Sequence, residues 1–114
     1  MPVRTFSLTA LLALALVASP AFAADGKELA ASAQAVLKTH CYRCHGQDGA
    51  VEGGVNYVTD LAKLVGRKKV VPGDPAASRL FKRIDDGTMP PPGEKVRPSA
   101  EEIAAVKQWI AAGA

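Results

Sequence analysis

The sequence has few aromatic residues, few cysteines and only a small charge imbalance. Its 114 residues contain one Trp, two Tyr and three Phe, and two of the Phe, Phe6 and Phe22, lie near the N-terminus. The rest of the chain is therefore short of the large side chains that dominate a small core, where burial is already marginal. The net charge of +3 at pH 7 does not point to nucleic acid or a membrane surface as a partner.

The first 23 residues have the pattern of an export signal. Arg4 supplies an early positive charge, residues 6–18 are almost entirely apolar, and Ala21-Phe22-Ala23 is an A-x-A cleavage site. An uncleaved membrane anchor is the alternative, but the apolar run is shorter than the roughly 17–25 residues that span a bilayer. We therefore expect residues 1–23 to be a signal peptide. Residues 24–114 then form one periplasmic or otherwise exported domain with no membrane-spanning segment.

Both cysteines lie in the pentapeptide Cys41-Tyr42-Arg43-Cys44-His45. The spacing C-x-x-C-H is the attachment signature of a c-type haem. Two thiols three residues apart lie on one side of a helical turn and can add to the two vinyl groups of one porphyrin. The next residue then supplies an imidazole nitrogen to the iron. The sequence predicts one covalently attached haem c, with Cys41 and Cys44 as thioethers and His45 as the proximal iron ligand.

Two other interpretations of C-x-x-C are a thiol–disulfide redox motif and half of a zinc site. Zinc requires four ligands, whereas the chain offers two Cys and two His, with His40 and His45 crowded against the cysteines. A redox motif of this kind follows a strand in a βαβ unit, and the sequence contains no convincing strand. His40 directly precedes Cys41 on the His45 side, so we expect it to pack near the haem edge rather than to ligate iron.

Apolar residues recur at helical spacing in four segments, which predicts an all-α fold of about four helices. The first helix covers 26–40, after a capping box of Asp25 and Glu28. Its buried stripe consists of Leu29, Ala33, Val36 and His40. Residues 46–56 form a glycine-rich loop, and a short helix over 59–65 follows with Thr59 as its cap.

The third helix is expected over 75–86, with Asp74 as its N-cap, Pro75 at its first position and Gly87 at its end. Its apolar face is formed by Ala77, Leu80, Phe81 and Ile84. The last helix opens with a second capping box, Ser99 and Glu102. Its buried stripe is formed by Ile103, Val106 and Ile110, with Trp109 on the flank.

Met89 lies in the Pro-rich segment 88–98, between the last two predicted helices. The prolines that follow hold the backbone extended, so that a single thioether is presented at a fixed place. A thioether on the iron raises the reduction potential. The alternatives are a methionine that fills a gap in the core, ligation by lysine, or an open iron site. We predict that Met89 is the distal iron ligand.

These residues together resemble a known family. Besides C-x-x-C-H they include Pro72-Gly73-Asp74-Pro75, Met89-Pro90-Pro91 and Trp109-Ile110 before Gly113-Ala114. The chain resembles the planctomycete-type cytochrome c domain, a branch of the small class I cytochromes c. The resemblance implies a small cytochrome c-like fold wrapped around one haem, with the first and last helices crossing at one haem edge. It also implies the same four haem and iron ligands.

The expected function is that of an exported, monomeric electron carrier rather than an enzyme, with redox proteins as partners. A haem protein with an open or labile sixth site, either peroxidase-like or a small-ligand sensor, is one alternative, and a small haem subunit of a dehydrogenase complex is another. Basic residues at 67–69 and 79–83 could steer an acidic partner or simply form a solvated face.

Overall fold

The computed structural model describes Pro2 and residues 25–114, so the predicted signal peptide lies, apart from Pro2, outside the described residues. The described part contains α-helices and short 3₁₀ turns but no strand, which confirms the predicted all-α class. Its helices are α1 (Gly26–His40), α2 (Leu61–Gly66), α3 (Arg79–Asp85) and α4 (Ala100–Ala111). Within the same residues, no helix has the length and apolar character needed to cross a membrane.

Helix α1 has the predicted bounds. The Asp25 carboxylate caps it by accepting a hydrogen bond from the N–H of Lys27 at 3.0 Å. The capping box predicted with Glu28 is wrong, because Asp25 bonds to the second N–H of the helix instead of the third. Helix α4 does open with the predicted capping box, in which Ser99 and Glu102 exchange hydrogen bonds of 3.0 and 3.1 Å.

Helix α2 begins two residues later than predicted. Its cap is Asp60, whose carboxylate accepts from the N–H of Lys63 at 3.0 Å, and not Thr59. An ionised carboxylate at a helix N-terminus is also favoured by the helix dipole. The predicted burial of Leu64 is confirmed, and Leu61 is partly buried.

The continuous helix predicted over 75–86 is wrong. Residues Pro75–Ala77 form a 3₁₀ turn, Ser78 is extended, and α3 starts at Arg79. The break occurs because the buried Ser78 hydroxyl bonds to the backbone of Val71 and Asp74 instead of facing solvent. As a result Ala77 is exposed, while Phe81 and Ile84 remain buried as predicted. The predicted cap is present, since Asp74 accepts from the N–H of Ala77 at 3.1 Å.

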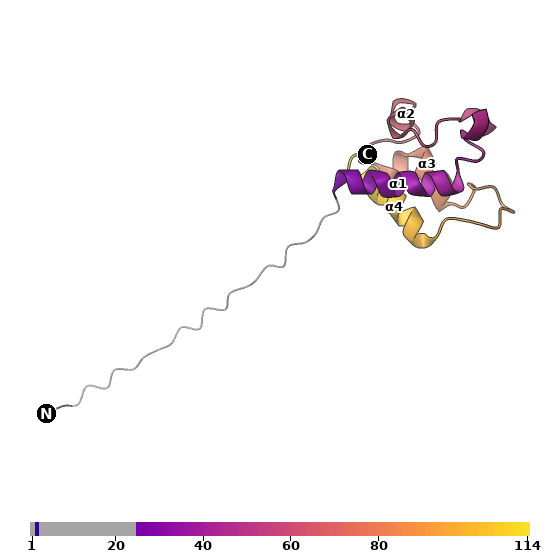
Figure 1. Cartoon of the computed structure of the whole chain (residues 1–114). Coiled ribbons are helices and arrows are strands. Elements are labelled where there is room, and N and C mark those ends of the chain that lie inside the picture. The colour runs from indigo at the N-terminus through magenta and orange to yellow at the C-terminus, as the bar shows by residue number, and fades with distance from the viewer. Residues whose placement is uncertain (1, 3–24) are drawn as a thin grey trace.

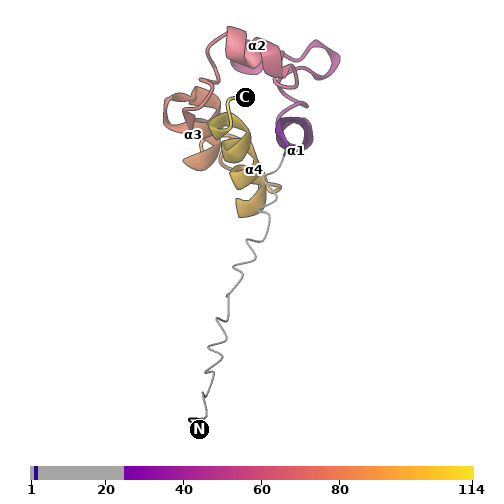
Figure 2. The ribbon, with the colours of Figure 1, turned by 90° about the vertical axis from the view of Figure 1, so that its left-hand side faces the viewer.

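Helices α1 and α4 pack against each other and cross, as the two ribbon views show (Figures 1 and 2). Helix α3 lies against α4. In Figure 2, α2 lies at the top of the domain, above α4. The buried apolar residues that join these elements are Ala33, Val36, Leu37, Val58, Leu64, Val70, Phe81, Ile84, Val106, Trp109 and Ile110. Two loops, residues 46–60 and 86–98, precede α2 and α4 respectively.

Candidate functional site

The C-x-x-C-H segment continues α1 as a further turn. Cys41 ends the helix, with its N–H donating to the carbonyl of Leu37 at 2.9 Å. The N–H of Cys44 donates to the Cys41 carbonyl at 3.2 Å, and that of His45 donates to the same oxygen at 3.0 Å. The local hydrogen bonds therefore fix Cys41, Cys44 and His45 in one turn at the end of α1.

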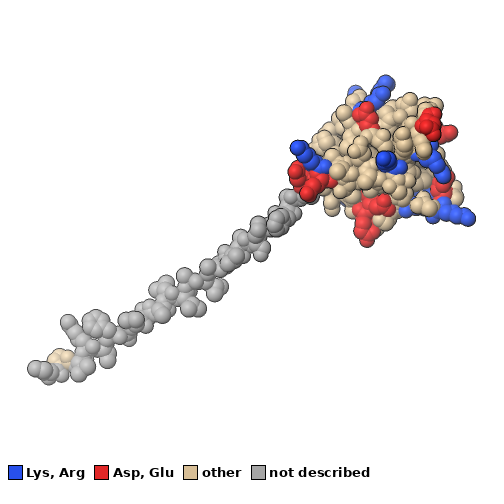
Figure 3. Space-filling model, viewed as in Figure 1, with Lys and Arg blue, Asp and Glu red and all other residues tan. Residues whose placement is uncertain are grey.

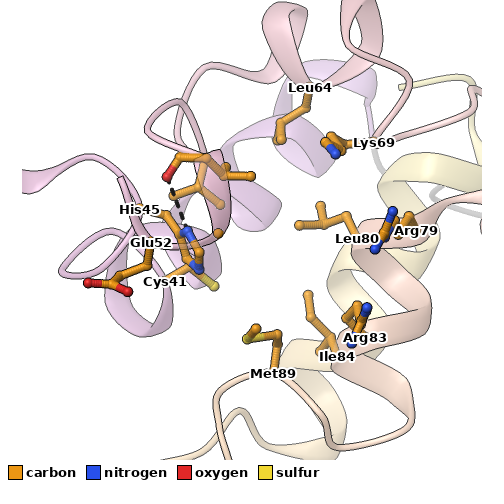
Figure 4. A pocket seen from close by; sticks show the side chains of 13 residues that line it. Cys41, His45, Glu52, Leu64, Lys69, Arg79, Leu80, Arg83, Ile84 and Met89 are labelled. Atoms are coloured by element: carbon orange, nitrogen blue, oxygen red, sulfur yellow. Dashed lines mark hydrogen bonds between the residues drawn. The ribbon is translucent and has the colours of Figure 1, made fainter. Parts of the chain in front are cut away.

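The loop that follows determines how the His45 ring is oriented. The ring Nδ1 lies 3.1 Å from the carbonyl oxygen of Val55 (Figure 4). A carbonyl can only accept, so Nδ1 donates to it, and in the neutral ring Nε2 is then the nitrogen that can bind a metal. The loop is itself tied to the motif, because the N–H of Glu52 donates to the Cys44 carbonyl at 3.1 Å and that of Val58 to the His45 carbonyl at 3.3 Å.

Gly46 allows this loop to turn back so closely. Its φ is +150°, and a Cβ at this position would lie 3.0 Å from the carbonyl oxygen of Asn56 and 3.1 Å from the Tyr42 ring. Any side chain would therefore displace either the part of the loop at Asn56 or the Tyr42 ring. Gly46 therefore permits a close approach between two parts of the chain.

Two cavities adjoin the motif, with volumes of about 320 and 360 Å³. Three of the four predicted haem and iron ligands, Cys41, His45 and Met89, line both, and Cys44 lines the second. In Figure 4 the side chains of Cys41 and His45 lie on one side of the first cavity, and Leu80, Ile84 and Arg83 lie on the other. The structure therefore brings all four residues to the second cavity, and three of them also to the first.

The first cavity is apolar inside and basic at one side. Its apolar wall is formed by Val55, Val58, Leu64, Leu80 and Ile84. Lys69, Arg79 and Arg83 also line it. Glu52 is its acidic residue, and Figure 4 shows the Glu52 carboxylate directed away from the cavity. Such a lining suits a flat apolar group that carries negative charge on its periphery.

Met89 is held at the other end of the site by its backbone. Its N–H donates to the carbonyl of Arg83, at the end of α3, at 2.9 Å. The side chain is 37% exposed, so it does not fill a gap in the hydrophobic core. It lies in a loop and lines both cavities, and its role as the distal iron ligand stays a prediction.

Cys41 lies in an environment that keeps its thiol neutral. Burial, and then the neighbouring Cys44, raise the pKa of Cys41 to about 11. Both cysteines are free thiols, as thioether formation requires. Within residues 25–114 no group of three or more His, Cys, Asp or Glu side chains is arranged to hold a metal ion, so the zinc interpretation lacks its ligands.

His40 and Trp109 lie beside the site in different ways. The His40 ring is 4% exposed, and its Nε2 is 2.9 Å from a carboxylate oxygen of Glu102, so the pair joins the end of α1 to the start of α4. The N–H of Ser99, and then His40, hold the pKa of the Glu102 carboxyl below its usual range. His40 lines the second cavity as a wall residue. Trp109 is buried in the core and lines neither cavity.

The donor set and the cavity lining both fit a covalently attached haem. The chain provides two thiols on one turn, an imidazole whose Nδ1 faces a carbonyl, a thioether that lines the same cavities, and an apolar wall. This combination, built on an all-α domain, defines the class of small c-type cytochromes.

The comparison with known families points to one branch of these cytochromes. Residues 41–93 match the family described as Planctomycete cytochrome C. This match supports the planctomycete-type cytochrome c domain that the sequence resemblance indicated. Neither curated proteins nor solved structures gave a match. A cytochrome c domain implies haem c with its iron as cofactor and suggests haem-based electron transfer, and such domains are typically exported.

Sequence reasoning missed several residues that shape this site. The Val55 carbonyl orients His45 across a loop, and no local pattern marks a carbonyl for that role. Lys69, Arg79 and Arg83 were assigned to an outward face or a docking surface, yet they also line the first cavity. On the face shown in Figure 3, Lys and Arg side chains are interspersed with Asp and Glu.

Proposed function

We propose that the mature chain is an exported mono-haem electron carrier that exchanges single electrons with redox partner proteins. Cys41 and Cys44 hold the porphyrin as thioethers, and His45 and Met89 ligate the iron from its two sides. Bound haem supplies a one-electron couple between Fe(III) and Fe(II). The observation that supports this most strongly is that His45 and Met89 line the same two cavities, with Nδ1 of His45 already engaged by Val55.

The side chains around the site tune this couple rather than perform proton chemistry. The apolar wall of Val58, Leu64 and Ile84 excludes water and disfavours the more highly charged oxidised state. The Val55 carbonyl fixes the tautomer of His45 and increases the basicity of its Nε2. The partial exposure of Met89 places this end of the site near the surface, where a partner protein can approach.

A peroxidase-like role is the main competing function. It would need an acid–base side chain beside an open iron position. The first cavity is lined by His45, which the proposal uses as a ligand, and by Glu52, whose carboxylate is directed away. The lining therefore favours the carrier. A role as the haem subunit of a larger oxidoreductase uses the same site and is compatible with the proposal.

The test replaces the proposed sixth ligand. The parent protein, produced in a host that attaches c-type haem, is expected to resist carbon monoxide in its reduced form at neutral pH. Met89→Ala should lose the sulfur-to-iron(III) charge-transfer band and bind carbon monoxide at least about tenfold more tightly, because a competing ligand has gone. Val51→Ala is the control, since Val51 is 54% exposed and lines neither cavity.

Two results would contradict the proposal. Rapid, stoichiometric binding of carbon monoxide by the parent would mean that the sixth position is open. An unchanged spectrum in Met89→Ala would mean that another group is the ligand. Val51→Ala is expected to behave as the parent in both assays.

A further inference from the structure

The segment that carries Met89 is held from outside by one arginine. Arg97 donates hydrogen bonds to three backbone carbonyls: Gly87 at 2.8 Å, Pro90 at 2.8 Å and Pro91 at 3.1 Å. Gly87 precedes Met89 by two residues, and the two prolines directly follow it. A single guanidinium therefore spans the chain on both sides of the proposed ligand.

The carbonyls of this segment have few other partners. Prolines have no N–H group, so residues 90–92 cannot form the usual turn hydrogen bonds of a loop. Among the described residues, Pro91 also accepts from the N–H of Glu94 at 3.1 Å, but for Gly87 and Pro90 the hydrogen-bond donor is Arg97. Removing the guanidinium would leave these two carbonyls to solvent and the loop without its cross-link.

The chemistry of arginine suits this task. The guanidinium is a planar fork with five N–H donors and stays charged at any pH at which the protein is folded. A lysine ammonium is a point charge on a flexible stem and cannot reproduce the arrangement in which one nitrogen serves two carbonyls and the other a third. Arg97 is followed by Pro98 and by Ser99, the cap of α4, so the cross-link is anchored to a helix.

We propose that Arg97 is a positioning residue that holds the Met89 segment in place for iron ligation by bridging the carbonyls of Gly87, Pro90 and Pro91. The N–H of Met89 is fixed to the Arg83 carbonyl at 2.9 Å, and Arg97 fixes the chain on the far side. The backbone of Met89 is thus restrained in both directions, which lowers the conformational entropy that its ligation would otherwise cost. This inference rests on the proposed function, since it requires Met89 to be a ligand.

The test measures how easily an external ligand displaces Met89. Imidazole is titrated into the oxidised holoprotein, and its apparent affinity for iron reports how firmly the thioether is held. We expect Arg97→Ala to bind imidazole about tenfold more tightly than the parent, and Arg97→Lys to shift in the same direction. Lys82→Ala removes an exposed positive charge from the neighbouring helix α3 at a residue that lines neither cavity, and this variant is expected to stay within about twofold of the parent.

The outcomes separate the two proposals. If the parent lacks the sulfur-to-iron(III) charge-transfer band, the proposed ligation fails and the role of Arg97 fails with it. If the parent has the band but Arg97→Ala binds imidazole as the parent does, only the role of Arg97 is overturned. An equal shift in Lys82→Ala would mean that charge alone is responsible, and would also overturn it. Should Arg97→Ala not fold, Arg97→Lys decides, and an unchanged affinity in that variant refutes the inference.

Discussion

Ser78 is a fully buried polar residue of the described core, which makes its hydroxyl a sharp test of how the site is built. Its Oγ accepts a hydrogen bond from the N–H of Val71 at 2.8 Å and donates to the carbonyl of Asp74 at 2.8 Å. These bonds tie the 71–77 turn to the start of α3, which carries Leu80 and Ile84 to the cavity wall. We predict that Ser78→Ala loosens this connection and destabilises the domain.

The expected loss follows from the bonds removed. The N–H of Val71 has no other partner among the described residues, and leaving a buried donor unpaired costs about 1–3 kcal/mol. Val71 itself is 36% exposed, so water can reach its N–H in part. We therefore expect a loss of about 2 kcal/mol in the free energy of unfolding. For a domain of this size, that corresponds to a decrease in Tm of roughly 8–16 °C.

Urea unfolding of the holoprotein, followed by circular dichroism at the helix band, measures this loss. The midpoint should fall while the dependence on urea concentration is unchanged. Ser32→Ala is the matched control, because Ser32 is exposed on α1 and alanine is the better helix former there. If Ser78→Ala loses less than about 0.5 kcal/mol, or no more than Ser32→Ala, the proposed role of the hydroxyl is refuted.

Two further predictions concern the loops and helix ends around the site. Gly46→Ala should lower the free energy of unfolding by about 1–3 kcal/mol. The loss should exceed that of Gly49→Ala, because both glycines have positive φ but only Gly46 has atoms within 4 Å of the added Cβ. Equal urea midpoints for the two variants would contradict this. The lowered pKa of Glu102 means that its contribution to stability is complete above the unfolded-state value of about 4.3 and is lost as the pH falls through the folded-state value. Glu102→Gln should therefore be less stable than the parent at neutral pH, and urea titrations should show that this difference in stability shrinks toward pH 3. A difference in stability that does not depend on pH would contradict the prediction.

The sequence alone was sufficient for features that depend on neighbouring residues. The attachment of haem follows from Cys41, Cys44 and His45 within one turn, and the family comparison, which begins at residue 41, agrees with it. The bounds of α1 and the capping box of α4 also follow from local signals. Such signals act over one helical turn, so they can be read without knowledge of the rest of the chain.

The break in the predicted helix 75–86 shows where local reasoning stops. The pattern of Ala77, Phe81 and Ile84 fits one continuous amphipathic helix. The Ser78 hydroxyl instead accepts a hydrogen bond from the N–H of Val71, seven residues earlier. A serine side chain can compete with helical hydrogen bonds in this way, but whether it does so depends on which backbone groups the fold brings near it.

What the sequence determined by itself was the class of cofactor, the turn that offers it two thiols and an imidazole, and the all-α fold of about four helices, because each depends on residue types at short spacing. Only the tertiary structure decided that Met89 faces the same hollow as His45, that the Val55 carbonyl orients the imidazole, and that Arg97 holds the loop. These contacts join parts of the chain that are separated by loops rich in glycine and proline. The path of such loops is set by packing against the helices, and no local periodicity records it.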